Sequence, residues 1–122
     1  MPAENMPMAP LAVEVRHAPD GAAVCTLAGD LDIESLEPAR EALDRLIAEQ
    51  PRLLVVDLGR IDFCDSSGLN LLLQARMAAT DSGLSFHLAA LSGNVRHLLE
   101  LTGAKAVFTI HDTVDEALSA AG

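Results

Sequence analysis

The chain has 122 residues, of which 50% are hydrophobic, so it can form one compact domain and is too short for two. Its 18 acidic residues against 8 lysines and arginines give a formal net charge of -10, which argues against nucleic acid and anionic membranes as partners and favours a basic protein. Trp and Tyr are absent, so the core must be mainly aliphatic and no aromatic platform exists for stacking bases or sugars.

The N-terminus and the cysteines are typical of a reduced, cytoplasmic protein. Residues 1–10 contain three prolines and no basic stretch followed by an apolar core, so we expect a flexible tail and no signal peptide, with the domain over residues 11–122. No apolar run approaches the roughly 18 residues of a membrane span. Cys25 and Cys64 lie in apolar segments and form no C-x-x-C motif, so buried, reduced thiols are expected.

The first half of the domain predicts a hairpin followed by a helix. Apolar and polar residues alternate over residues 11–16, which is the period of a half-buried strand. A turn rich in Pro, Asp and Gly leads to a second strand over residues 22–28, and the short connection indicates a hairpin. Helical spacing of apolar residues then predicts a helix that opens at Glu34 or Ser35 and ends before Pro51.

The second half alternates strands and helices. The continuously apolar run 53–58 predicts a strand buried on both faces, joined to the hairpin by a parallel, right-handed crossover. Further elements are a helix over 66–81, a strand over 84–88, a helix capped at 92–94 and ended by Gly103, a strand over 107–110, and a helix capped by Asp112. We write the order as βββαβαβαβα, or βαβα-like after an initial hairpin. The predicted class is α/β, a single domain with a mixed sheet, an N-terminal hairpin and about four helices packed on it.

A polar corner separates the central strand from the helix that follows it. The corner is Asp65-Ser66-Ser67-Gly68. Backbone N–H groups at a helix start have no intrahelical partner and carry partial positive charge, so a hydroxyl there is exposed. A phosphate attached to that hydroxyl would be well solvated by the fold itself.

The residues offer little support for an enzyme or a metal site. A serine at such a corner could be a hydrolase nucleophile, but the corner lacks the leading glycine of G-x-S-x-G. His97 and His111 lie beside charges and His87 falls on the polar side of its strand, so we interpret all three as surface residues. Together with His17 they form no i, i+4 pair, so no metal site is expected. Phosphate-binding glycine motifs are also missing, so we expect no catalytic residue and no cofactor.

Three stretches of the sequence form a family pattern: Gly29-Asp30-Leu31-Asp32, Val55-Val56-Asp57-Leu58 and Ile61-Asp62-Phe63-Cys64-Asp65-Ser66-Ser67-Gly68-Leu69. In this order, after a hydrophobic strand, they resemble the STAS-domain anti-sigma factor antagonists of bacteria. The resemblance covers about residues 11–118. It departs at Cys64, where another apolar residue is common, and we expect that change to be neutral for packing.

This resemblance implies a switch controlled by phosphorylation. In the family, the unphosphorylated antagonist binds an anti-sigma factor that is also a serine kinase, and so frees the sigma factor for transcription. The kinase then phosphorylates the antagonist and releases it, and a phosphoserine phosphatase resets the site. By resemblance the phosphorylated residue is Ser66, with Ser67 as the alternative. Asp65 and Asp32 match family positions that support binding and phosphorylation.

The helix after Ser66 offers a contact surface for a partner. We expect five of its residues to face the sheet: Leu71, Leu72, Ala75, Ala78 and Ala79. The outer face is then formed by Leu69, Asn70, Leu73, Gln74 and Met77, although Leu69 and Leu73 could instead belong to the core. The expected partner-binding set adds Asp30, Asp32, Asp65, Ser67 and Gly68, an acidic edge where a phosphate increases like-charge repulsion.

A second interpretation is a STAS scaffold or transport-associated binding subunit without a phosphorylation switch. In such a protein, substitution of Ser66 by alanine would have no effect. An esterase-like enzyme is a third interpretation, and it requires hydrolysis of activated esters that depends on Ser66.

Overall fold

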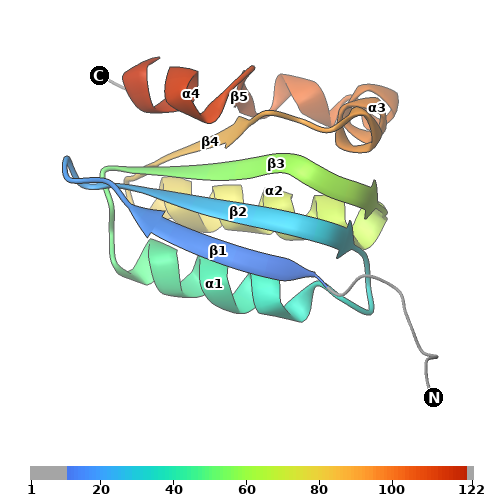
Figure 1. Ribbon diagram of the computed structural model, residues 1–122, viewed down its shortest axis with the longest axis horizontal. Helices are drawn as coiled ribbons and strands as arrows, with labels where there is room; N and C mark the ends of the chain where they lie inside the picture. Colours follow the sequence, from blue (N-terminus) through green and yellow to red (C-terminus); the bar gives the residue numbers. More distant parts are fainter. Residues whose placement is uncertain (1–10, 121–122) are drawn as a thin grey trace.

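The computed structural model describes residues 11–120, and the tail expected over residues 1–10 lies outside them. The described chain forms one five-stranded sheet in the order β1-β2-β3-β4-β5 (Figure 1). β1 pairs with β2 antiparallel, and the other neighbours pair parallel. The strands are β1 (Ala12–His17), β2 (Ala22–Leu31), β3 (Leu53–Cys64), β4 (Ser85–Ala89) and β5 (Thr109–His111). The helices are α1 (Glu37–Ala48), α2 (Ser66–Asp81), α3 (Gly93–Thr102) and α4 (Val114–Ala120), with the short 3-10 helix η2 (Ala104–Ala106) before β5.

The predicted α/β class, with a mixed sheet, an N-terminal hairpin and four helices, is confirmed. The expected order contained one strand too many, because the observed order is ββαβαβαβα. No third strand precedes α1, since β2 runs unbroken to Leu31 and a turn over residues 32–35 follows it. Within residues 11–120 no helix is both long and apolar enough to cross a membrane.

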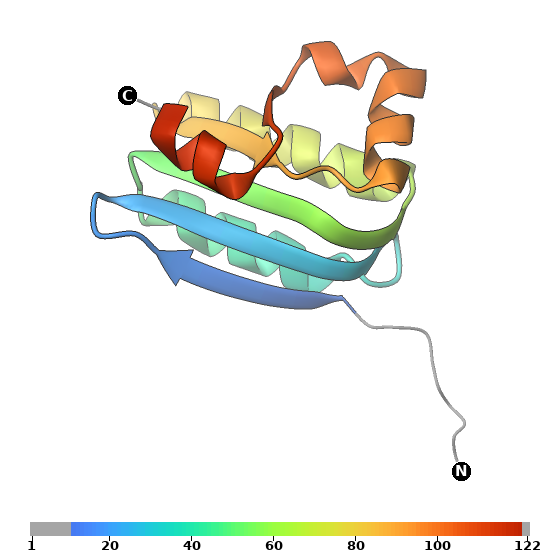
Figure 2. The same ribbon diagram turned by 45° about the horizontal axis from the view of Figure 1, so that its top comes forward.

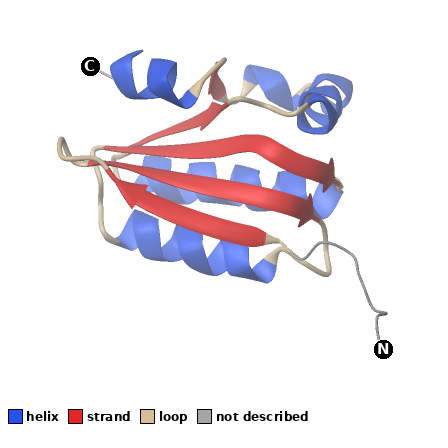
Figure 3. Ribbon diagram, in the orientation of Figure 1, coloured by secondary structure: helices blue, strands red, loops and turns tan. Residues whose placement is uncertain are grey.

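Helices cover the two faces of the sheet unequally. α1 and α2 lie on one face and α4 lies on the other (Figures 1 and 3). β2 shows both environments, because Leu27 belongs to the large core under α1 and α2, whereas Val24 belongs to a smaller cluster with Ala117 of α4. Figure 2 shows that α4 leaves the β1 side of its face uncovered. No polar or charged side chain is buried within the described part of the chain.

β3 is longer than the sequence predicts. The expected strand over 53–58 continues to Cys64 and reaches 12 residues. Its first half is buried except for the half-buried Asp57, whereas the second half consists of exposed pairs of residues, which include Arg60 and Phe63, separated by buried ones such as Ile61. Register shifts between β2 and β3 interrupt the ladder along this second half. The polar residues there therefore belong to a half-exposed strand, and the corner begins only at Asp65.

Helix ends follow the capping signals of the sequence with two exceptions. The Oγ of Ser92 accepts a hydrogen bond from the Val95 N–H at 3.4 Å, and Gly103 ends α3 with φ of 77°, both as predicted. α1 begins later than expected, at Glu37. α4 is capped by Thr113 instead of Asp112, because the Thr113 Oγ1 accepts the Glu116 N–H at 3.0 Å.

The last strand is shorter than predicted. β5 starts at Thr109 instead of 107, because η2 and a turn occupy the preceding residues.

Cys25 and Cys64 are buried free thiols, as expected. Their burial raises the pKa of both thiols to about 11, so neither is a reactive thiolate near neutral pH.

Candidate functional site

Asp65 forms the N-terminal cap of α2. Its backbone is extended, and its Oδ1 accepts hydrogen bonds from the N–H groups of Ser67 at 2.9 Å and Gly68 at 3.2 Å. The first helical hydrogen bond runs from the Leu69 N–H to the Asp65 carbonyl oxygen at 3.0 Å. Two N–H groups that a helix start leaves without a partner are therefore satisfied by one carboxylate.

Ser66 is the first residue of α2 and is exposed, whereas Ser67 is half-buried. The Ser66 hydroxyl is thus the more accessible of the two to another protein. A shallow depression of about 420 Å³ adjoins it, lined by Ser66, Ser67, Leu69, Asn70 and Leu73. Five residues that the sequence predicts for the site therefore line one surface feature.

Gly68 supports this turn from below. It is buried, and a Cβ at this position would collide with the carbonyl oxygen of Leu31 and would lie 2.9 Å from the Cys64 sulfur. The Asp65 N–H also donates to the Leu31 carbonyl oxygen, at 3.3 Å. A side chain at residue 68 would therefore push α2 away from the end of β2. Gly68 therefore has a packing role. Because it is buried, it offers no exposed surface for the partner contact that the sequence predicts.

The outer face of α2 differs in part from the prediction. Asn70, Gln74 and Met77 are exposed and Leu73 is half-buried, but Leu69 is only 8% exposed and belongs to the core. The outward position expected for Leu69 is therefore wrong. Leu69 is one turn before Leu72, and residues three apart on a helix share a face.

Two further details of α2 were not expected. Ala78, predicted to face the sheet, is exposed, whereas Leu71, Leu72, Ala75 and Ala79 are buried as predicted. Gln74 accepts a hydrogen bond from the Nη1 of Arg40 at 3.3 Å, which links the outer face of α2 to α1. The partner contacts expected for Asn70, Leu73, Gln74 and Met77 stay a prediction.

Acidic side chains gather at the ends of β2 and β3. They are Asp30, Asp32, Glu34, Asp62 and Asp65. The Asp32 Oδ1 accepts the N–H groups of Glu34 at 3.1 Å and Ser35 at 3.0 Å, so this residue also shapes the turn before α1. Among residues 11–120 the ion pairs lie elsewhere, and none of these carboxylates takes part in one. The surface around Ser66 therefore carries several carboxylates that have no ion-pair partner among residues 11–120.

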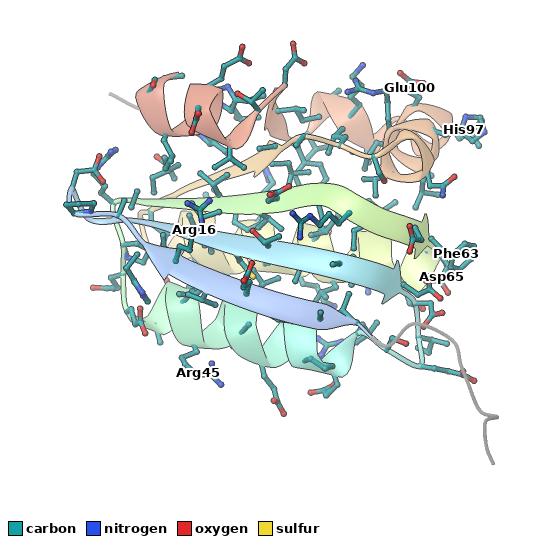
Figure 4. The ribbon with its side chains drawn as sticks, in the orientation of Figure 1. Arg16, Arg45, Phe63, Asp65, His97 and Glu100 are labelled. Carbon is teal, nitrogen blue, oxygen red and sulfur yellow. The ribbon has the colours of Figure 1, made fainter. Side chains whose placement is uncertain are left out.

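The start of α3 belongs to the same end of the molecule, which the sequence did not reveal. The Asn94 side-chain amide donates to the Asp62 carbonyl oxygen, and the Ser92 N–H donates to the Leu58 carbonyl oxygen at 3.2 Å. Figure 4 shows Phe63 and Asp65 next to each other at this end. These bonds join segments about 30 residues apart, for which local sequence patterns give no signal.

A histidine pair lies on β4 and β5, at the edge of the sheet opposite β1. The His111 Nε2 and the His87 Nδ1 are 3.1 Å apart, and both residues are half-buried. The two histidines therefore lie at the surface, as expected, but they are not fully solvated, because the parallel neighbours β4 and β5 bring their rings into contact. No group of three or more potential metal ligands occurs among residues 11–120.

Comparison with known proteins identifies the class. Residues 13–117 match the model of the STAS domain, so the chain belongs to the STAS-domain family, as the sequence pattern around Ser66 predicts. The match spans the sheet and all four helices, ending within α4. The matched residues therefore include the corner that carries Asp65 and Ser66.

Individual relatives are bacterial regulators. The anti-sigma-F factor antagonist RsfB of Mycobacterium tuberculosis is 29% identical over 100 residues, which are 82% of this chain and 81% of that protein. The crystal structure of an anti-sigma factor antagonist from Mycobacterium paratuberculosis has a TM-score of 0.83 and 27% identity, covering 91% of this chain and 93% of that one. The phosphorylated form of the Bacillus protein SpoIIAA has a TM-score of 0.71, covers 91% of this chain and 100% of its own, and at 21% identity shows the fold alone.

Proposed function

We propose that this protein is an anti-sigma factor antagonist whose binding is switched off by phosphorylation of Ser66. In its unphosphorylated form it binds an anti-sigma factor that is also a serine kinase, and the sigma factor is released. The observation that carries this proposal is the exposed Ser66 hydroxyl on the capped first turn of α2, in a STAS domain whose relatives are named as anti-sigma factor antagonists.

The chain is then a substrate and a binding partner, not a catalyst. The Ser66 Oγ accepts the terminal phosphoryl group of ATP, ADP leaves, and the hydroxyl proton passes to a base on the kinase. Ser66 is exposed and Ser67 is half-buried, which supports Ser66 as the acceptor. A phosphoserine phosphatase completes the cycle by restoring the hydroxyl.

The cap geometry supports an effect on the complex and not on the fold. The Asp65 carboxylate already accepts the N–H groups of Ser67 and Gly68, so a phosphate on Ser66 does not gain these donors. This modifies the expectation that the helix start solvates the phosphate. The phosphate adds about -1.5 to -2 charges and projects into solvent beside Asp65. It therefore meets the partner, and above all the phosphates of the nucleotide that the kinase holds opposite Ser66.

Affinity purification from the native host tests this proposal. The baits are the wild-type chain and the variants Ser66→Ala, Ser66→Asp and Ser67→Ala, with bound proteins and phosphopeptides identified by mass spectrometry. We expect one protein kinase to be retained by all baits except Ser66→Asp, and phosphate to map to Ser66. If all four baits retain the same proteins and Ser66 is never phosphorylated, the chain is a STAS scaffold without a switch.

A further inference from the structure

Two large apolar side chains are exposed on either side of the Ser66 corner. The Ile33 side chain, in the turn after β2, is 70% exposed, and the Phe63 side chain, near the end of β3, is 50% exposed. Neither belongs to the two apolar clusters of the described chain. Exposed apolar patches with a polar rim mark sites of protein interaction.

The sheet brings together the two segments that carry these residues. β2 and β3 are parallel neighbours, with Asp30 paired to Phe63 and Leu31 paired to Cys64. Neighbouring strands are about 4.8 Å apart, so the turn carrying Ile33 begins directly beside the end of β3. The hydrogen bond from the Asp65 N–H to the Leu31 carbonyl oxygen, 3.3 Å long, ties the two strand ends together immediately before Ser66. Figure 4 shows Phe63 next to Asp65 at this end.

Carboxylates neighbour both apolar residues: Asp32 and Glu34 flank Ile33 in the chain, Asp62 precedes Phe63, and Asp30 is paired with Phe63 across the strands. Asp30, Asp32, Glu34, Asp62 and Asp65 come from the same two strand ends, and within the described chain none of them has a cationic partner. We call this set, together with Ile33 and Phe63, the acidic docking patch. Apolar residues at the centre and charges around them match the usual anatomy of a protein interface. Its complement is an apolar pocket bordered by Lys or Arg side chains.

We propose that Ile33 and Phe63 are the apolar anchors with which the unphosphorylated chain docks on its kinase, in a pocket of the kinase bordered by basic side chains. This inference rests on the proposed function and names the surface and the partner chemistry that serve it. The patch and Ser66 face different groups of the partner. The carboxylates face its basic residues, whereas Ser66 must face the terminal phosphate of the nucleotide. A phosphate on Ser66 therefore repels the nucleotide even though the surrounding patch attracts the kinase.

Matched single substitutions separate anchors from other exposed apolar residues. The probe is the purified host kinase that phosphorylates Ser66 with ATP, and dissociation constants are measured by calorimetry in the presence of ADP. Interface anchors dominate binding energy, so Phe63→Ala and Ile33→Ala should each weaken binding by about tenfold or more. Leu101 of α3 is 71% exposed and lies outside the patch, so Leu101→Ala should change the affinity by less than about twofold.

The carboxylates should act mainly on the rate of association. The variants Asp30→Asn and Asp62→Asn remove charge at positions where the side chain makes no hydrogen bond within the described chain. Each should slow association with the kinase several-fold at low salt and reduce the dependence of that rate on ionic strength. Unchanged association rates for both variants would contradict the basic border assigned to the kinase pocket.

Ser66→Asp, measured in the same series, distinguishes this inference from the proposed function. If Ser66→Asp loses the kinase while Phe63→Ala and Ile33→Ala bind like the wild type, the anchors are wrong and the switch stands. If Leu101→Ala weakens binding as much as the anchor variants, the patch has no special role. If the kinase binds Ser66→Asp like the wild type, the proposed function fails.

Two controls exclude an effect on folding. Circular dichroism checks that each variant is folded. Phe63→Leu, which keeps an apolar anchor, should bind the kinase more tightly than Phe63→Ala.

Discussion

Gly68 in the first turn of α2 packs directly against the carbonyl oxygen of Leu31 at the end of β2. This contact between backbones brings the first turn of α2, which carries Ser66, close to the end of β2. The motif Asp-Ser-Ser-Gly therefore combines three functions in four residues: Asp65 caps the helix, Ser66 is exposed, and Gly68 permits the close approach.

Gly68→Ala should destabilise the protein. The added methyl group overlaps the Leu31 carbonyl oxygen, and such overpacking costs about 1–3 kcal/mol of unfolding free energy. Urea denaturation measures the change. Gly93→Ala is the matched control, because nothing lies within 4 Å of a Cβ at that position. Equal stability of the two variants would show that α2 can move away from β2 without cost.

Asp65→Ala should cost about 0.5–2 kcal/mol of unfolding free energy, because the Ser67 and Gly68 N–H groups lose their acceptor. Asp65→Asn keeps a side-chain oxygen at the same place and should stay within a few tenths of a kcal/mol of the wild type. Thermal melts of the three proteins check this order. If Asp65→Asn is as unstable as Asp65→Ala, Asp65 does not stabilise the protein by capping α2.

The pair of His87 and His111 should make stability depend on pH. Burial, and then the charge of His111, lower the pKa of His87 below its ordinary value. The folded state therefore binds fewer protons at His87 than the unfolded state. The stability that depends on a neutral His87 is fully present above the ordinary histidine pKa of about 6.5, and it is lost as the pH falls below this value. The nearby acidic residues of the β5–α4 region, Asp112, Asp115 and Glu116, are exposed and do not contribute to this shift.

Unfolding free energies between about pH 5 and pH 8 test this prediction. His87→Gln should flatten the dependence on pH over this range. His97→Gln removes an exposed histidine on α3 and should leave the dependence unchanged. The prediction is wrong if wild type and His87→Gln lose stability equally on acidification.

The sequence predicted most elements because their signals are local. Apolar periodicity identified the strands and helices, and the predicted caps at Ser92 and Gly103 lie within a few residues of the backbone groups they serve. The class followed from the alternation of these elements. β3 was predicted too short because its second half is exposed on one side and polar, and periodicity alone does not distinguish such a segment from a loop.

Features that depend on tertiary packing could not be predicted. Leucines occupy successive positions at 71–73 as well as 69, so the sequence does not tell which of them the sheet buries. The approach of Gly68 to Leu31 and the contact between His87 and His111 join residues far apart in the chain. The exposure of Phe63 depends on the register of β3 against β2, which is shifted near the end of the strand.

The phosphorylation switch is tested most directly by comparing one chain in two chemical states. The purified kinase is titrated with the unphosphorylated chain, with the chain phosphorylated stoichiometrically on Ser66, and with Ser66→Ala after incubation with ATP. We predict that phosphorylation weakens binding by about a hundredfold or more, which corresponds to about 2.7 kcal/mol, while circular dichroism is unchanged and Ser66→Ala keeps its affinity. Equal affinity of the two states, or loss of the folded spectrum on phosphorylation, would contradict a switch that acts at the interface through Ser66.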